Sequence, residues 1–268
     1  MNNLPEPYYQ DENSVLYCGD SALVLKELPD KSIDLTVTSP PYDNLRTYKG
    51  FVFDFETIAK ELYRVTKDGG VVVWVVGDQI INGCKTGNCF RQALKFIEFG
   101  FNLWDDMAYV KDPRYPRHNA YSSCWEHMFI FSKGAPETLN PIKRNNFHRS
   151  KNKLMTNRGK NGQMVAKRIN LNTESTLYNV WYYSSGYMKT TKDKEAYEHL
   201  AIFPEQLVKD HIYSWSNEGD TVLDCFCGSG TTLKAAKILK RKSIGIEISK
   251  EYCELIVRRI NKPIPLFE

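Results

Sequence analysis

Two short motifs contain the residue types in this chain that are best suited to chemistry. The run TSPPY at residues 38–42 offers a hydroxyl and backbone carbonyls as hydrogen-bond acceptors, two prolines that stiffen the loop, and an aromatic face. The run DCFCGSGTT at residues 224–232 contains glycines, which allow a ligand to approach the backbone closely. The first motif predicts a loop that handles a planar base, and the second predicts a loop that binds a cofactor.

Both motifs follow stretches that are typical of buried strands. Residues 33–38 (IDLTVT) are rich in β-branched side chains and lead into the first motif, and residues 221–223 lead into the second. Open α/β sheets bind their ligands beyond the carboxyl ends of the strands. Each motif alone is weak, because Ser-Pro-Pro is common in loops and glycine-rich turns follow many strands. Together they predict one site at one edge of a sheet.

Strands and helices alternate along the rest of the chain. The expected strands are 15–18, 33–38, 71–76, 103–110, 126–131, 221–223 and 243–247. The expected helices are 22–28, 55–65 with Asp54 as its cap, 90–97, 204–214, 231–239 and 250–260. This alternation predicts an α/β fold with a mostly parallel, doubly wound sheet.

In order and spacing, the motifs resemble those of the DNA amino-methyltransferases that use S-adenosylmethionine, in the permuted beta class whose catalytic loop precedes the cofactor loop. TSPPY matches the family's (Asp/Asn/Ser)-Pro-Pro-(Tyr/Phe) catalytic signature, and DCFCGSGTT matches its cofactor signature. The similarity covers nearly the whole chain except a central basic stretch. It implies the Rossmann-like fold of class I methyltransferases, with seven strands of which one is an antiparallel edge strand.

The resemblance implies S-adenosyl-L-methionine as the cofactor and S-adenosyl-L-homocysteine as the product. About twenty residues after the glycines, Glu247 ends a strand, where a carboxylate can accept both ribose hydroxyls. A dinucleotide oxidoreductase would show the same geometry in this half. The resemblance adds Asp20 for the adenosine part of the cofactor and Phe203-Pro204-Glu205 for its methionine part. By sequence alone, this run is equally typical of the first turn of a helix. The full cofactor set is Asp20, Phe203, Pro204, Glu205, Asp224, Phe226, Gly228, Ser229, Gly230, Thr231 and Glu247.

The catalytic candidates are Ser39, Pro40, Pro41 and Tyr42. An exocyclic amino group is a poor nucleophile, because its lone pair is delocalised into the ring of the base. Acceptors aimed at the amino hydrogens localise that pair, and the Ser39 hydroxyl and the Pro40 carbonyl are the candidates. Tyr42 offers a face for a base that has left the duplex, and the prolines fix the geometry beforehand. The methyl group would pass directly to nitrogen, with no covalent intermediate and no metal.

The identity of Ser39 bears on which base is modified. Relatives that act on cytosine N4 usually have serine at this position, whereas those that act on adenine more often have Asp or Asn. The resemblance therefore favours cytosine N4, with adenine N6 as the alternative. A Pro-Cys-Gln motif is absent, which argues against methylation of a ring carbon. An RNA or protein methyltransferase and a catalytically silent nucleic-acid-binding relative remain as other classes.

Positive charge is concentrated in the middle of the chain. The net charge is +4, yet residues 133–194 contain 13 Lys or Arg against 3 Asp or Glu. Such a segment can neutralise phosphates and read bases, although a solvated basic loop has the same composition. We expect residues 1–132 to form the catalytic half, 133–194 the recognition segment and 195–268 the cofactor half. The predicted DNA-binding residues are Lys143, Arg144, Arg149, Lys151, Lys153, Arg158, Lys160, Lys167 and Arg168.

Bulk properties agree with an intracellular DNA enzyme. The opening segment is polar and the longest apolar run, 71–76, is too short to cross a bilayer, so we expect a cytoplasmic protein of a prokaryote or phage. The seven cysteines are scattered, and Cys225 and Cys227 form the only close pair, so neither a disulfide framework nor a zinc site is expected. Double-stranded DNA is the expected partner. A cognate restriction endonuclease and the choice between monomer and homodimer remain open.

Overall fold

The computed structural model describes residues 5–41, 53–112, 119–145, 153–169, 173–199 and 201–263. The chain divides into two compact units, one formed by Met1–Asn140 with Asn179–Glu268 and the other by Pro141–Tyr178. The first unit contains both motifs. The second contains all nine predicted DNA-binding residues and lies within the predicted segment 133–194.

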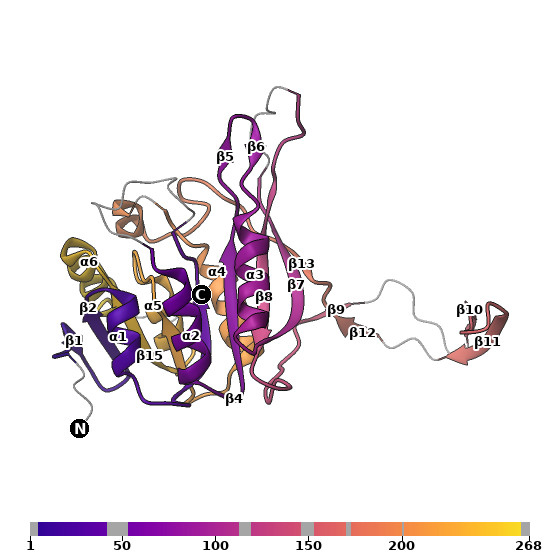
Figure 1. The fold of residues 1–268 in the computed structure, drawn as a ribbon, viewed down its shortest axis with the longest axis horizontal. Helices are drawn as coiled ribbons and strands as arrows, with labels where there is room; N and C mark the ends of the chain where they lie inside the picture. The colour runs from indigo at the N-terminus through magenta and orange to yellow at the C-terminus, as the bar shows by residue number, and fades with distance from the viewer. Residues whose placement is uncertain are drawn as a thin grey trace. The chain divides into compact units, whose positions relative to one another are not determined.

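The first unit is built on a twisted sheet (Figure 1). In the described residues the sheet has nine strands in the order β1-β2-β15-β14-β3-β4-β8-β7-β13. They are β1 (Tyr9–Gln10), β2 (Ser14–Cys18), β15 (Lys242–Glu247), β14 (Thr221–Asp224), β3 (Ile33–Thr38), β4 (Thr66–Val76), β8 (Trp125–Ser132), β7 (Asn102–Val110) and β13 (Val180–Tyr182). Five consecutive strands, from β2 to β4, pair in parallel, as the alternating pattern predicts.

The number and order of the strands differ in detail from what the resemblance implied. The sheet of the described residues has nine strands instead of seven, because the short strands β1 and β13 extend its two ends. The reversed strand β8 is not at the edge. It follows β7 directly in the chain, pairs antiparallel with it, and also pairs antiparallel with β4, so it lies inside the sheet. At the edge, the antiparallel strand is the two-residue β1.

Helices cover both faces of the sheet (Figure 1). They are α1 (Ser21–Glu27), α2 (Phe55–Val65), α3 (Asn88–Glu98), α4 (Glu205–Trp215), α5 (Thr231–Ile238) and α6 (Lys250–Ile260), with the 3-10 helix η1 (Lys194–Glu198). On one face α1, α2 and α3 pack around the fully buried Trp74 of β4. On the other, Leu233 of α5 packs with Ile256 of α6. None of the described helices is long and apolar enough to cross a membrane.

Local sequence signals explain where the helices begin. The Asp54 carboxylate accepts a hydrogen bond from the Thr57 amide at 3.2 Å, which confirms the predicted cap of α2. Helix α3 begins at Asn88, earlier than predicted, because Gly87 adopts a left-handed φ of 69° and Asp78 accepts from the Cys89 amide at 3.1 Å. Asp78 lies ten residues before Asn88, outside the apolar pattern of the helix, so no local signal in the sequence indicated that its side chain accepts from the first turn of α3.

The described residues of the second unit contain two small antiparallel strand pairs. Strand β9 (Lys143–Asn145) pairs with β12 (Glu174–Thr176), and β10 (Lys153–Arg158) pairs with β11 (Met164–Ile169). In the first unit a further hairpin, β5 (Ile80–Ile81) with β6 (Cys84–Lys85), follows β4. None of these pairs was predicted from the sequence, because such short, exposed strands lack a buried face that would set a period.

Candidate active site

One buried carboxylate joins the two motifs. Strands β3 and β14 are neighbours in the sheet, with Leu223 opposite Thr36. Asp224, at the end of β14, accepts a hydrogen bond from the Thr38 hydroxyl at 2.7 Å and from the Thr232 hydroxyl at 2.6 Å. Its side chain is almost completely buried, and burial raises its pKa. The two loops therefore leave neighbouring strands from a shared anchor, as expected for motifs that both follow parallel strands.

The catalytic candidates follow β3 at this edge. Ser39 and Pro41 are half-buried and Pro40 is buried, so the loop begins within the protein surface and not as a solvated tail. Tyr42 lies outside the described residues. Its predicted stacking role is therefore untested, and so are the acceptor roles of Ser39 and Pro40, which depend on a substrate.

The glycines of the cofactor loop are required by their immediate surroundings. Gly228 and Gly230 have left-handed φ values of 52° and 77°. A Cβ on Gly228 would lie 2.9 Å from the ring of His199, and one on Gly230 would lie 2.9 Å from Ile256. The motif alone assigned this space to a ligand, whereas the protein's own side chains already fill part of it. Helix α5 starts directly after Gly230, so its free amide groups face the loop.

Glu247 lies beside this loop at the end of β15. One carboxylate oxygen accepts from the Gly228 amide at 2.8 Å, and the other accepts from the Ser249 amide at 2.9 Å. Only 8% of the residue is exposed, and burial raises its pKa to about 7. Its backbone carbonyl accepts from Gly19, which places Asp20 close by. The carboxylate is therefore held in position and is partly protonated near neutral pH.

A cavity of about 670 Å³ opens next to Asp20. Asp20 caps α1 by accepting from the Ala22 amide at 2.7 Å, and it lines the cavity together with residues around the start of α2. Among them is Phe53, whose ring lies 5.5 Å from that of Phe226 in the cofactor loop. Phe53 therefore contacts the cofactor motif from the wall of a cavity that Asp20 also lines, and no sequence motif indicated this residue.

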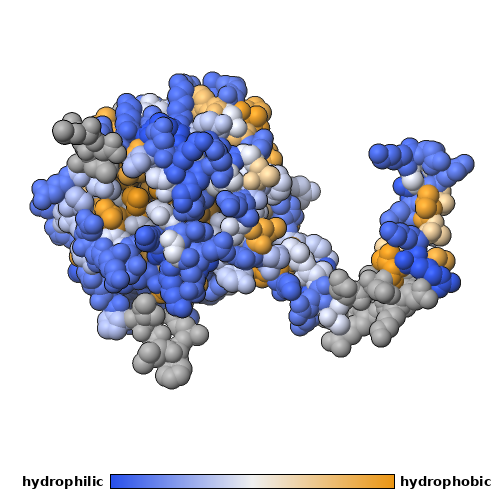
Figure 2. Space-filling model, turned by 90° about the horizontal axis from the view of Figure 1, so that it is seen from below, coloured by the Kyte–Doolittle hydropathy of each residue, from blue (hydrophilic) through white to orange (hydrophobic). Residues whose placement is uncertain are grey.

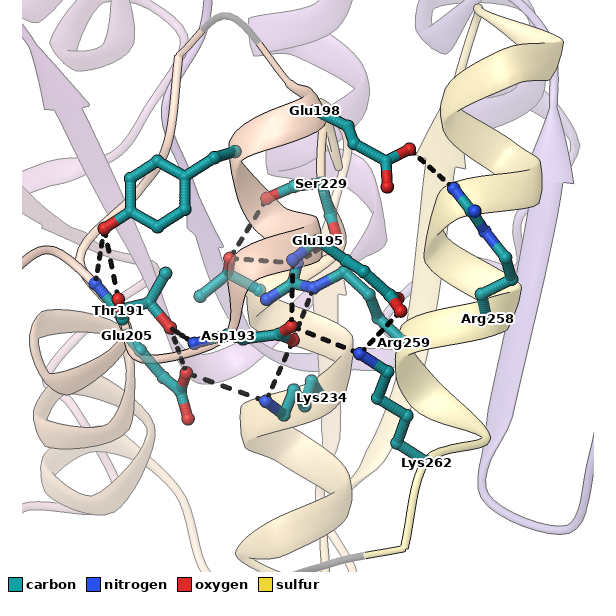
Figure 3. A network of polar contacts seen from close by, with 12 residues as sticks. Thr191, Asp193, Glu195, Glu198, Glu205, Ser229, Lys234, Arg258, Arg259 and Lys262 are labelled. Atoms are coloured by element: carbon teal, nitrogen blue, oxygen red, sulfur yellow. Dashed lines mark hydrogen bonds and ion pairs between the residues drawn. The ribbon is translucent and has the colours of Figure 1, made fainter. Parts of the chain in front are cut away.

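The Phe-Pro-Glu run begins a helix, as one of its two interpretations stated. Pro204 is the N-cap of α4, and Glu205 is the first helical residue. The Glu205 carboxylate accepts from the Thr191 hydroxyl at 2.9 Å (Figure 3). It also pairs with Lys209 at 3.1 Å. Lys234 of α5 lies 3.8 Å away. Burial raises the pKa of Glu205, but these lysines bring it below its ordinary value, so the carboxylate is charged.

A buried ion cluster supports the cofactor loop from the side of α6. Arg259 is fully buried, donates to the Ser229 carbonyl, and pairs with Asp193 at 2.9 Å (Figure 3). Lys234 and Lys262 also lie 3.2 Å and 3.4 Å from this aspartate. Burial raises the pKa of Asp193, but the cations hold it well below its usual range. A signal for Arg259 was available, because it falls on the otherwise apolar face of the last predicted helix.

The basic residues of the second unit lie mostly at its surface. Arg158, Lys160, Lys167 and Arg168 are exposed, and apolar Leu154, Met155, Met164 and Val165 are exposed on the same two strands. Figure 2 shows orange and blue side chains side by side on the β10–β11 hairpin. In the predicted DNA-binding set, Arg149 and Lys151 fall outside the described residues, as does the side chain of Lys153.

Two members of that predicted set already have partners inside the second unit. The Arg144 guanidinium lies over the ring of Tyr178 at 4.0 Å and donates to its hydroxyl at 2.6 Å. Lys143 is 3.6 Å from Glu174 across the β9–β12 pair. These contacts hold β9 and β12 together. The exposed basic residues of the β10–β11 hairpin are therefore more available to bind phosphates than Lys143 and Arg144 are.

The fold and the paired loops define a Rossmann-like methyltransferase. A model of the N6/N4 DNA methylase family matches residues 33–258, and the chain belongs to this family. It is 50% identical over 250 residues to the orphan methyltransferase M.BamHII of Bacillus amyloliquefaciens, covering 90% of this chain and 93% of the relative. It is 29% identical over 263 residues to the type II methyltransferase M.HpaI of Haemophilus parainfluenzae, covering 94% and 76%.

Solved structures share the fold. The cytosine-N4-specific PvuII DNA methyltransferase superposes with a TM-score of 0.69 at 22% identity, covering 96% of this chain and 89% of that one. The complex of M1.HpyAVI with SAM gives a TM-score of 0.60 at 22% identity, covering 93% and 100%. The chain is thus a site-specific DNA amino-methyltransferase, and its family includes enzymes that act on adenine N6 and on cytosine N4.

Proposed function

We propose that this protein transfers a methyl group from S-adenosyl-L-methionine to cytosine N4 in double-stranded DNA. The observation that supports this proposal most directly is the shared Asp224 anchor, which sets the TSPPY loop beside the glycine loop. Ser39 at the first motif position favours cytosine, and the PvuII enzyme of the same fold is cytosine-N4-specific. Adenine N6 is the alternative, because both amines can donate to a hydroxyl.

The residues around the loop suit this cofactor, which supplies an electrophilic methyl group when bound. Glu247 would accept the ribose hydroxyls, since its two oxygens are already oriented by backbone amides and have lone pairs left. The cavity beside Asp20 and Phe53 suits a flat ring. Phe203 and Pro204 directly precede α4, and Glu205 is its first residue. These three residues would contact the methionine part of the cofactor. M1.HpyAVI, with the same fold, has been solved with SAM.

In the catalytic step a bond would form between the methyl carbon and the amino nitrogen while the bond from that carbon to the sulfonium breaks, and one amino proton would pass to water; the protein's residues would supply positioning and hydrogen bonds. The Ser39 hydroxyl and the Pro40 carbonyl would accept from the amino hydrogens of the base and localise its lone pair. Two consecutive prolines limit the loop's conformations, so this geometry costs little entropy when the substrate arrives. The Thr38 hydroxyl, fixed on Asp224, orients the residue before the acceptors. Tyr42 would stack on the base, and the exposed cations of the second unit would contact phosphates.

The test is to digest DNA that has been treated with enzyme and cofactor and to identify the modified nucleoside. N4-methylcytosine supports the proposal, and N6-methyladenine alone supports the alternative. Ser39→Ala should lose at least about a hundredfold in kcat, the range that positioned acid–base groups contribute, while cofactor affinity stays unchanged. Replacing Lys167 and Arg168 by alanine should weaken DNA binding and flatten its salt dependence by roughly one unit of slope for each phosphate that is no longer neutralised.

A further inference from the structure

The β5–β6 hairpin lies at the same edge of the sheet as the catalytic loop. It follows β4 closely in the chain, and β4 pairs in parallel with β3 so that Trp74 lies opposite Thr38. The segments that follow β3 and β4 therefore leave the sheet in the same direction, and Figure 1 shows the hairpin projecting beyond the strand ends. At most about 20 Å of extended chain separates Trp74 from Ile80, from roughly 3.3 Å per residue. The hairpin tip and the TSPPY loop can thus face one DNA site.

The hairpin has a defined shape before any ligand binds. Asn82 and Gly83 have φ values of 50° and 81°, as a two-residue type I′ turn requires. Ile80 pairs with Lys85 across the hairpin. At its base the Asp78 carboxylate accepts from the Cys89 amide at 3.1 Å and so ties the hairpin to α3. A tip held in this way loses little conformational entropy when it contacts a partner.

The side chains of β5, directly before this turn, are unusually apolar for a strand pair that meets only water. Ile80 is 40% exposed and Ile81 is 52% exposed, although isoleucine is among the residue types most often fully buried. Lys85, next to them, has its ammonium 5.7 Å from the ring of Trp125, which is itself 41% exposed. The hairpin therefore presents two branched apolar side chains with a cation beside them. Within the described residues of the first unit, packing leaves a large part of both isoleucines open to solvent.

We propose that Ile80 and Ile81 enter the DNA duplex beside the target base and fill the space that this base leaves when it rotates into the site. This inference rests on the proposed function. Flipping a base exposes the apolar faces of its stacked neighbours and costs a few kcal/mol. Branched apolar side chains that insert between base steps can cover those faces, and Lys85 would contact a phosphate. The isoleucines would thus stabilise the flipped state.

The test compares an Ile80→Ala, Ile81→Ala double variant with wild type on a duplex oligonucleotide, whose site is first found by sequencing modified DNA. A second duplex carries a mismatch opposite the target base, so that the base is already unpaired. The matched control is Leu103→Ala, which removes a side chain of similar exposure, 41%. Leu103 lies at the start of β7, at the end of the sheet opposite to the catalytic loop. Thermal unfolding of each variant verifies that the fold is retained.

On the paired duplex, kcat/KM of the double variant should fall about tenfold or more, because the cost of flipping is no longer offset. On the mismatched duplex the loss should shrink to less than about threefold, since that substrate is already unstacked. An equal loss on both duplexes, or no loss on either, overturns the inference. A wild-type enzyme that methylates no DNA would instead overturn the proposed function, so the two failures are distinguishable.

Discussion

Replacing Asp193 by asparagine tests whether the buried ion cluster supports the cofactor loop. The aspartate is 7% exposed and its partner Arg259 is fully buried, while Lys234 and Lys262 also pair with it. The asparagine keeps the size and one acceptor but removes the charge. Arg259 then remains buried without a counterion while it still donates to the Ser229 carbonyl. We therefore expect both the fold and the cofactor loop to be weakened.

The magnitude follows from the burial of the pair. Removing one partner of a buried ion pair costs about 3 to 5 kcal/mol, and we expect the lower end because the amide oxygen still accepts a hydrogen bond. For a protein of this size that corresponds to a fall in Tm of about 6 to 12 °C. The matched control is Asp30→Asn. Asp30 pairs with Arg64 but its side chain is 75% exposed, so its loss should cost less than about 1 kcal/mol. Urea unfolding measures both variants.

Two further measurements separate charge from shape. Adding Arg259→Met to Asp193→Asn removes the unpaired cation, so the double variant should regain part of the lost stability. The pKa of Asp193 lies below its unfolded value, so its contribution is present above about pH 4 and is lost only in stronger acid. The difference in unfolding free energy between the wild type and Asp193→Asn should therefore stay constant between about pH 5 and 7. Equal stability of Asp193→Asn and Asp30→Asn would refute this reasoning.

Two other predictions concern the two motifs. Burial raises the pKa of Glu247 to about 7, and an ionised carboxylate accepts hydroxyls best, so calorimetric affinity for S-adenosyl-L-methionine should rise between about pH 6 and 8. Glu247→Gln should bind weakly at all these values, and a retained pH dependence would contradict the role. Thr38→Val should lose about 1 to 3 kcal/mol of unfolding free energy, because a buried carboxylate loses a donor. Thr36→Val, on the same strand, removes a buried hydroxyl with no partner among the described residues and should be neutral or stabilising; similar losses for both would argue against the anchor.

The alternation of strands and helices was enough to predict the layers of the sheet and the loops at its edge. Strand β4 shows why, since its run Val71–Val76 is buried throughout and is apolar without interruption. The position of β8 could not be predicted in the same way. Apolar patterns indicate that a strand is buried, but they do not indicate which neighbours it pairs with. The resemblance gave the wrong place for the reversed strand, and only the pairing with both β4 and β7 corrects it.

The sequence indicated candidate site residues where a motif is contiguous, and it did not indicate the distant residues that pack against them. Ser39 and Gly228 stand in contiguous motifs with recognisable spacing. Asp193 stands among other charged residues in a loop, and nothing in its neighbours indicates that it lies beside Arg259, 66 positions further along the chain. The same holds for His199, which fills the space at Gly228. Contacts of this kind arise from the sheet order, which brings η1, α5 and α6 together.

The order of the two motifs along the chain has no effect on how they act together. Thr38 and Asp224 are separated by 186 positions yet share one buried hydrogen bond, because β3 and β14 are neighbours in the sheet. Thr232 donates to the other oxygen of the same carboxylate, and the Phe226 amide donates to the same oxygen as Thr38, so displacing either loop removes a hydrogen bond from this carboxylate. Losing a hydrogen bond at so buried a position is costly, because water does not readily replace the donor. The two motifs are therefore anchored on one buried carboxylate at the ends of neighbouring strands, and under the proposed function this anchor would set the distance from the methyl donor to the acceptor nitrogen.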